Sequence, residues 1–83
     1  MQLELLTPAK TIFSGEVKLV NLPGSLGYFE ILQNHAPIIS SLTEGELRIE
    51  TESGEKLRYT ISGGVVEVLN NHIMALVESI EGQ

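Results

Sequence analysis

Short runs in which apolar and polar residues alternate are the feature of this sequence that most restricts its fold. They recur along the chain and are separated by Gly, Pro, Asn and Ser, whereas no window of about 11 residues keeps an apolar stripe with the 3.6-residue period of a helix. Successive side chains of a strand point to opposite faces of a sheet, so the period of two is typical of half-buried strands. Several short strands with turn signals between them predict an all-β sandwich or barrel.

The clearest hairpin is predicted for residues 46–61, ELRIETESGEKLRYTI. Apolar side chains must lie opposite apolar ones, because a slip of one residue would turn every side chain to the other face. The predicted register pairs Ile49 with Tyr59 and Leu47 with Ile61 and, on the other face, Glu50 with Arg58 and Glu52 with Lys56. It leaves a three-residue loop, Ser53-Gly54-Glu55. The bases Arg48, Lys56 and Arg58, with Lys18 on another strand, are interpreted as a solvated face.

A second hairpin is predicted for residues 65–77, with Asn70-Asn71 as its turn, because Asn tolerates a positive φ better than most residues. This turn places Val68 opposite Ile73 and Val66 opposite Ala75. Gly63-Gly64 before it indicates a bulge or a close approach of two backbones. The N-terminal MQLELL and residues 16–22 are predicted as further strands, joined through Phe13-Ser14-Gly15.

Composition narrows the class of protein. The 83 residues predict one domain, 1–83, and the absence of cysteine excludes disulfides and thiolate metal sites. The net charge of −6, from 11 acids and 5 bases, disfavours nucleic acid and anionic lipid as partners. A basic protein surface would be attracted, although moderate acidity also simply keeps a small protein soluble. The apolar runs are too short for a membrane helix, and MQLELL lacks the basic region of a signal peptide.

No constellation for catalysis or for metal or cofactor binding is found. His35 and His72 are isolated histidines without metal-ligand spacing, and His72 is interpreted as a solvated turn residue. No serine lies in a GxSxG elbow, and the glycines of PGSLG form neither GxGxxG nor a phosphate-binding loop. A hydrolase would need a pocket with a perturbed acid or base, which nothing here nominates. An enzyme is therefore the least supported class.

The stretch LPGSLGYFEILQNHAPI, residues 22–38, has three Gly or Pro turn signals before Tyr28 and ends in an Asn-His-Ala-Pro corner. It fits a catalytic loop, a ligand cradle or a surface for a protein partner. The stretch resembles the signature of the epsilon subunit of F-type ATP synthase, L-P-G-x-x-G-x-F-G-x-L-P-G-H-A-P-L. The matching residues are Leu22, Pro23, Gly24, Gly27, Phe29, Leu32, His35, Ala36 and Pro37.

The resemblance continues in order along essentially the whole chain. Further matches are Thr7-Pro8, Phe13-Ser14-Gly15, Gly45 with Arg48 and Ile49, and Ser62-Gly63-Gly64 with Glu67 and Val68. The sequence departs from the signature where Gln33-Asn34 replaces Pro-Gly, where Glu30 replaces Gly, and where Tyr28 occupies a position often held by an acid. Asn34 is still expected to serve a tight turn.

The resemblance implies a small antiparallel β-sandwich of about ten short strands and a non-catalytic rotor subunit. Such a subunit binds gamma and the c-ring at the foot of the central stalk and helps couple ion flow to ATP synthesis. It has no cofactor of its own, and the catalytic nucleotide sites lie on other subunits. Its place is peripheral, on the cytoplasmic face of the bacterial inner membrane, with membrane contact only through the complex.

The resemblance also assigns interface residues. Those expected at the c-ring are Ser25, Leu26, Gly27, Tyr28 and Glu30, and those expected at gamma are His35, Ala36, Pro37 and Ser40. Each assignment has a purely structural alternative. His35 is also suited to a hydrogen bond within its own loop. The apolar character of Phe29, Ile31 and Leu32 favours the core over an interface.

Members of the family commonly carry two helices after the β domain, and in many of them this hairpin restrains ATP hydrolysis or binds ATP. This sequence stops at SIEGQ, so it is expected to be a short form without that hairpin, and those activities are not assigned to it. The sequence fits a naturally short subunit and equally a truncated form of a longer one. The alternative function, from another class, is a free-standing β-sandwich module that binds a peptide or small ligand at a sheet edge.

Overall fold

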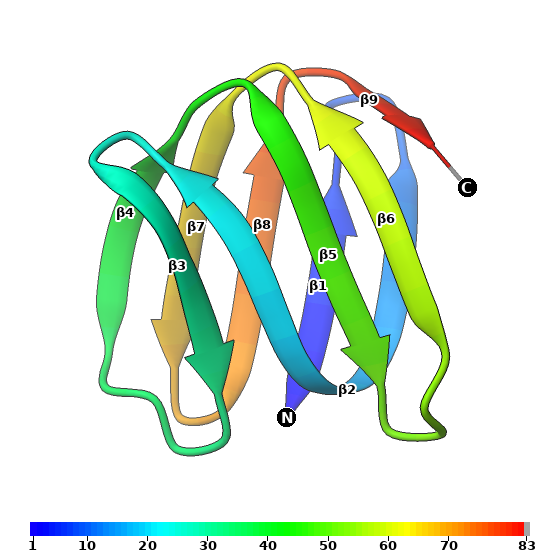
Figure 1. Cartoon of the computed structure of the whole chain (residues 1–83), viewed down its shortest axis with the longest axis vertical. Coiled ribbons are helices and arrows are strands. Elements are labelled where there is room, and N and C mark those ends of the chain that lie inside the picture. Colours follow the sequence, from blue (N-terminus) through cyan, green and yellow to red (C-terminus); the bar gives the residue numbers. More distant parts are fainter. Residues whose placement is uncertain (83) are drawn as a thin grey trace.

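The computed structural model describes residues 1–82 and has nine strands within that range (Figure 1). Their bounds are β1 Gln2–Leu6, β2 Thr11–Gly24, β3 Gly27–Leu32, β4 Ile38–Leu42, β5 Gly45–Thr51, β6 Lys56–Ile61, β7 Gly64–Leu69, β8 His72–Val77 and β9 Ile80–Gly82. The all-β prediction is confirmed, with nine strands where about ten were expected.

Strand β2, the longest at 14 residues, takes part in both layers of a sandwich. Its first half, from Thr11 to Glu16, pairs with β1, and its second half, from Val17 to Gly24, pairs with β3 and β5. The front layer in Figure 1 therefore consists of β3, the second half of β2, β5, β6 and β9. The back layer consists of β4, β7, β8, β1 and the first half of β2.

The core lies between these layers and follows from the alternation of side chains. In β8, for example, Ile73, Ala75 and Val77 are buried while the residues between them are exposed. Burying a Val, Leu or Ile side chain contributes about 1.5–3 kcal/mol. The fully buried large side chains come from seven of the strands: Leu3, Leu5, Val17, Val20, Leu22, Ile31, Leu47, Ile49, Ile61, Val66, Val68 and Ile73.

The predicted β5–β6 register is wrong by two residues, although each side chain keeps its predicted face. Leu47 pairs with Tyr59, Ile49 with Leu57, Glu50 with Lys56 and Arg48 with Arg58. The loop does have three residues, but these are Glu52-Ser53-Gly54, because the amide of Thr51 donates to the carbonyl of Glu55 (2.8 Å). Gly54 has φ +95°, and a three-residue hairpin loop needs this conformation at its last position, not at its centre.

The predicted β7–β8 hairpin is confirmed. Val68 lies opposite Ile73 and Val66 opposite Ala75, and both turn asparagines have positive φ, 51° at Asn70 and 60° at Asn71. The predicted close approach of backbones occurs at Gly64, which has φ +153°. A Cβ there would collide with the Leu76 carbonyl oxygen and would lie 2.8 Å from the Val77 Cα.

Two features of the N-terminal region differ from the sequence prediction. Phe13-Ser14-Gly15 does not join two strands but lies within β2, and the connection is the turn at residues 7–10. The Thr7 hydroxyl accepts from the amides of Ala9 (3.3 Å) and Lys10 (3.2 Å), which fixes this turn. Strand β1 also pairs with β8 in parallel, whereas the other pairings are antiparallel within the described range.

Candidate functional site

The tip of the β2–β3 hairpin protrudes at one end of the sandwich. Gly24 pairs with Gly27, so Ser25 and Leu26 form the turn, and the Leu26 side chain is fully exposed at 106%. Gly27 has φ +131°, a conformation that favours glycine. The Ser25 and Ser41 hydroxyl oxygens lie 2.7 Å apart, and the Ser25 amide donates to the Ser41 carbonyl (3.1 Å). The tip is thus anchored on β4 while its leucine stays free.

Tyr28 follows the tip and is held at its hydroxyl end. The Glu46 amide donates to the Tyr28 hydroxyl oxygen (2.9 Å), while 59% of the residue's surface remains exposed. The absence of a side chain at Gly45 leaves room for this hydroxyl, because a Cβ at Gly45 would lie 2.6 Å from the oxygen. The ring therefore presents a fixed apolar surface, and the hydroxyl accepts a bond from within the domain.

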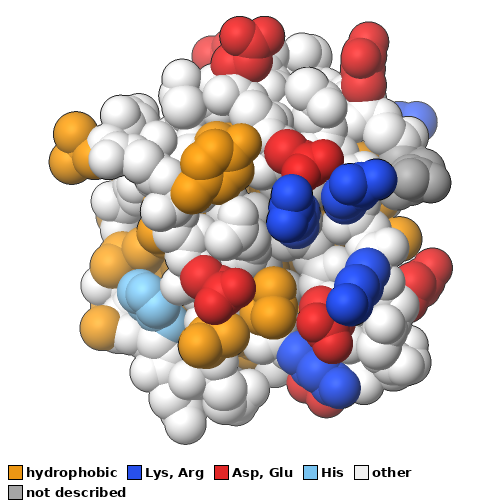
Figure 2. Space-filling view, viewed as in Figure 1, with side chains coloured by type: hydrophobic (Ala, Val, Ile, Leu, Met, Phe, Trp, Pro, Cys, Tyr) orange, Lys and Arg blue, Asp and Glu red, His pale blue; other side chains and the backbone are white. Residues whose placement is uncertain are grey.

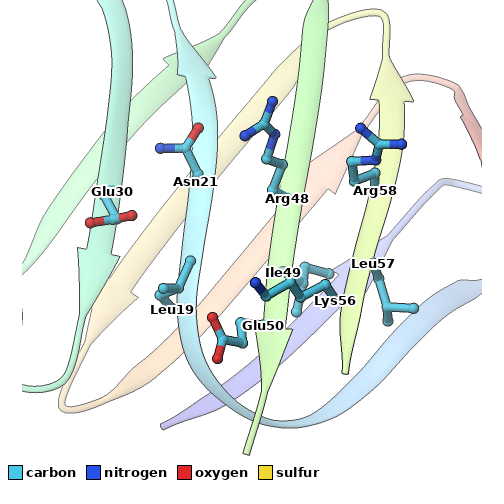
Figure 3. A pocket seen from close by; sticks show the side chains of 9 residues that line it. All are labelled: Leu19, Asn21, Glu30, Arg48, Ile49, Glu50, Lys56, Leu57 and Arg58. Carbon is cyan, nitrogen blue, oxygen red and sulfur yellow. The ribbon is translucent and has the colours of Figure 1, made fainter. Parts of the chain in front are cut away.

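Glu30 lies farther along β3, away from the tip, although it was grouped with the tip residues from the sequence. It pairs with Asn21 and is exposed on the outer face of the front layer, as Figure 3 shows. The same alternation exposes Leu32 (49%), so the expectation of a core position is wrong for Leu32. It is confirmed for Ile31, which is fully buried, and Phe29 is half-buried against the core.

The His35 corner lies at the other end of β3, between β3 and β4. Asn34 has φ +65°, which confirms its tight-turn role. Its amide donates to Asn71 Oδ1 (2.6 Å), and Asn71 Nδ2 donates to Asn34 Oδ1 (3.0 Å), so the corner is joined to the β7–β8 turn. His35 Nδ1 lies 2.7 Å from the Ala36 carbonyl oxygen, in agreement with a hydrogen bond within its own loop.

Ser40 is separated from the other residues assigned to gamma. It lies in β4 opposite the buried Val66, is half-buried, and its hydroxyl donates to the Ser41 carbonyl (3.2 Å). A shallow pocket places it beside the hairpin tip, together with Ser25 and Tyr28. His35, Ala36 and Pro37 remain together at the corner. The structure therefore brings Ser40 to the residues assigned to the c-ring.

Five exposed apolar side chains lie around the exposed Glu67 on the outer face of the back layer, and the sequence reasoning missed them. We call this group of side chains the apolar face; its members are Ile39 (74% exposed), Val65 (40%), Leu69 (51%), Met74 (40%) and Leu76 (43%). The ladder joins them, since Val65 pairs with Leu76 and Glu67 pairs with both Ile39 and Met74. A pocket that extends from Pro37 to Leu69 connects the face to the His35 corner.

A signal for the apolar face was present in the sequence. The segments VVEVL and IMALV are apolar at nearly every position, whereas a strand with one solvated face alternates. Near-continuous apolar strands indicate that both faces are covered. Patches of this kind on a small domain mark interaction sites.

Groups suited to catalysis are not assembled in the described part of the chain. Within residues 1–82 no three His, Asp or Glu side chains are placed to hold a metal, and no helix is long and apolar enough to cross a membrane. His72 is exposed, as predicted, but it is the first residue of β8 and not part of the turn, and its Nε2 lies 3.7 Å from Glu4 Oε1. Burial, with a smaller contribution from the Glu55 carboxylate, raises the pKa of Tyr59.

A family model described as "ATP synthase, Delta/Epsilon chain, beta-sandwich domain" matches residues 1–83. The chain belongs to this family. The resemblance read from residues 22–38 is thereby confirmed.

Relatives in the delta/epsilon family are named ATP synthase epsilon chain and differ in length. That of Syntrophomonas wolfei is 38% identical over 79 residues, which is 95% of this chain and 58% of the relative. That of Desulfosudis oleivorans is 43% identical, and the match covers 98% of this chain and 61% of the relative. That of Chlorobaculum tepidum is 36% identical, and the match covers 94% of this chain and 89% of the relative. The chain thus spans just over half of the longer relatives and most of the shorter one.

Two solved structures of ATP synthases contain a chain whose fold agrees with the observed sandwich. A chain in the mitochondrial ATP synthase of Euglena gracilis, solved as an OSCP/F1/c-ring assembly, superposes with a TM-score of 0.89 at 26% identity; the match covers 96% of this chain and 51% of that one. A chain in the central stalk and c-ring structure of the Tetrahymena thermophila enzyme gives 0.81 at 21% identity, covering 99% and 66%. The second likeness supports the fold alone.

Proposed function

We propose that residues 1–83 form one domain, the β-sandwich of a non-catalytic rotor subunit in the central stalk of an F-type ATP synthase. The domain binds the gamma subunit with one surface and the c-ring with another, and so helps couple ion translocation to ATP synthesis. The observation that carries the proposal is the family match along the whole chain. The likeness to a chain of the Euglena OSCP/F1/c-ring assembly supports it.

The proposed c-ring contact is the hairpin tip, formed by Ser25, Leu26, Gly27 and Tyr28. Leu26 and the fixed Tyr28 ring offer apolar area. No atom beyond the two neighbouring residues lies within 4 Å of a Cβ built on Gly27, so a partner backbone can approach closely. Glu30 also belongs to the proposed contact, at its margin. An exposed ion pair contributes only about 0.2–1 kcal/mol, so Tyr28 outweighs Glu30.

The proposed gamma contact begins at His35, Ala36 and Pro37 and continues over the apolar face. Ser40 lies where the gamma contact would meet the hairpin tip. Continuity between the corner and an exposed apolar surface supports one interface, because covering such a surface releases water. The acidic domain is also suited to a basic partner surface.

This role places the domain on the cytoplasmic face of the bacterial inner membrane, in contact with the membrane only through the complex. It binds no cofactor and carries out no chemical step. Ion flow and nucleotide chemistry belong to other subunits.

The gamma contact is tested by two charge insertions measured against purified gamma subunit. Leu76→Glu, in the apolar face, should weaken binding at least about tenfold, because it buries a carboxylate in an apolar interface. Leu32→Glu is the control, since Leu32 is similarly exposed (49% against 43%) but lies in the front layer. Equal effects of the two variants would remove the apolar face from the interface.

The c-ring contact is tested by binding the chain together with gamma to a reconstituted ring. Tyr28→Ala should weaken binding more than Glu30→Gln. A larger effect of Glu30→Gln would show that charge dominates, and no effect of either would exclude this contact. Recovery of the chain from cells without gamma and the ring would favour the free-standing binding module instead.

A further inference from the structure

The outer face of the front layer carries a groove of about 460 Å³ between strands β2, β5 and β6. We call it the basic groove; its lining is Leu19, Asn21, Glu30, Arg48, Ile49, Glu50, Lys56, Leu57 and Arg58 (Figure 3). Three of the five bases in this acidic chain line it. Figure 2 shows Lys and Arg side chains gathered on this face. It faces away from the apolar face, which belongs to the other layer.

Two of these bases are placed in an unfavourable arrangement. Arg48 lies directly opposite Arg58 in the antiparallel ladder, and like charges in that position destabilise a sheet. A local rule broken without gain to the fold is typical of functional sites. The repulsion is only partly relieved by one carboxylate, since Glu46 lies 2.8 Å from Arg48 Nε and 3.9 Å from Arg58 Nη1.

The two guanidiniums retain unused donors. Each guanidinium has five N–H groups, so a single carboxylate cannot occupy both. Their side chains are 60% and 61% exposed, and Figure 3 shows both on neighbouring strands beside the groove. Further carboxylates brought by a partner would fit this arrangement, because arginine pairs with carboxylates through two parallel hydrogen bonds.

The lining of the groove also restricts the form of the partner. Glu30 and Glu50 lie in the same groove as the bases, so an extended polyanion or a flat anionic membrane would meet carboxylates as well. The overall charge of −6 opposes both. A short segment is able to place acidic residues on the arginines and an aliphatic residue on half-buried Leu19.

We propose that the basic groove binds an acidic protein segment, whose carboxylates pair with Arg48, Arg58 and Lys56 and whose aliphatic side chain covers Leu19. The groove shares Glu30 with the margin of the proposed c-ring contact and shares no residue with the proposed gamma contact. It gives the rotor domain a third surface, over strands β2, β5 and β6 of the front layer.

The test uses the 83-residue chain and a short capped peptide with three glutamates and one leucine, Glu-Leu-Glu-Ser-Glu, followed by NMR at the backbone amides and arginine Nε–H groups. The peptide should shift the signals of Arg48 and Arg58, and its affinity should fall as salt is added. Arg58→Gln should weaken binding about two- to fivefold, the range for one exposed ion pair. Its melting temperature should be unchanged or higher, because a like-charge contact is removed.

Matched controls decide whether the groove is responsible. Lys10→Gln removes the same charge from the exposed turn between β1 and β2 and should leave the affinity unchanged. The same peptide with Gln in place of Glu should not bind. Three results would each overturn the proposal: no binding of the acidic peptide, equal weakening by Lys10→Gln, or displacement of the peptide by inorganic phosphate or by phosphatidylglycerol vesicles.

Discussion

The pair of asparagines that joins the His35 corner to the β7–β8 turn leads to a quantitative prediction about the stability of this corner. Asn34 and Asn71 share two hydrogen bonds, one from the Asn34 amide to Asn71 Oδ1 (2.6 Å) and one from Asn71 Nδ2 to Asn34 Oδ1 (3.0 Å). Both residues have positive φ, 65° and 60°. Substitution by Gly tolerates this backbone and removes only the side chain.

The geometry gives different losses for the two single variants. Asn34→Gly keeps its own amide and loses one hydrogen bond, whereas Asn71→Gly loses both. Exposed hydrogen bonds of this kind contribute about 0.5–1 kcal/mol each. Asn34→Gly should therefore lower the free energy of unfolding by about 0.5–1 kcal/mol and Asn71→Gly by about 1–2 kcal/mol. In a domain of this size 1 kcal/mol corresponds to about 4–8 °C in melting temperature.

The double variant is the decisive member of the series. Asn34→Gly removes a bond that Asn71→Gly has already removed, so the double variant should be no less stable than Asn71→Gly alone. The assay is urea unfolding of all four proteins, with the coupling energy taken from the cycle. Losses that add within about 0.3 kcal/mol would show that the two side chains do not interact, and the account of the corner would be wrong.

Three further predictions follow from single contacts. Gly64→Ala should cost at least about 1–3 kcal/mol of stability, because a Cβ meets the β8 backbone at φ +153°; a melt unchanged from the parent chain would refute the close approach. Tyr28→Phe loses the hydrogen bond from the Glu46 amide and should lower the free energy of unfolding by about 0.5–1.5 kcal/mol. Because the ring is kept, affinity for the c-ring should fall less than in Tyr28→Ala. Equal losses of affinity in the two variants would mean that the hydroxyl carries the contact. Because the pKa of Tyr59 is raised in the folded state, the unfolded chain loses the phenol proton at a lower pH than the folded chain does. The free energy of unfolding is therefore unaffected by this group below about pH 10 and falls as pH rises through the folded pKa. Tyr59→Phe should lose less stability above about pH 10 than the parent chain, and identical pH profiles of the two proteins would contradict the shift.

The sequence predicted what is local and periodic. The β7–β8 hairpin was predicted with its pairing because two asparagines in succession fix a tight turn. The β5–β6 hairpin was predicted with the right faces and loop length, but alternation alone does not distinguish registers that differ by two residues. The conformation of Gly54 determines which of these registers forms, together with the Thr51 hydroxyl, which accepts from the Glu55 amide (3.0 Å).

Local sequence patterns do not predict which distant strands pair with one another. The parallel pairing of β1 with β8 and the passage of β2 between layers depend on how distant segments close the sandwich. The same holds for the candidate site. Neither the bond from the Glu46 amide to Tyr28 nor the Asn34–Asn71 pair follows from a motif, since their partners are 18 and 37 residues apart.

The central claim is that one domain holds two partners on two distinct surfaces, and cross-linking tests it most directly. The chain has no cysteine, so single cysteines can be introduced without background. In the assembled complex, a photoactivated cross-linker on Leu26→Cys should join the chain to a ring subunit, and one on Leu76→Cys should join it to gamma. Ser53→Cys, exposed in the β5–β6 loop, should join it to neither. Exchanged partners, or adducts from Ser53→Cys alone, would contradict the account.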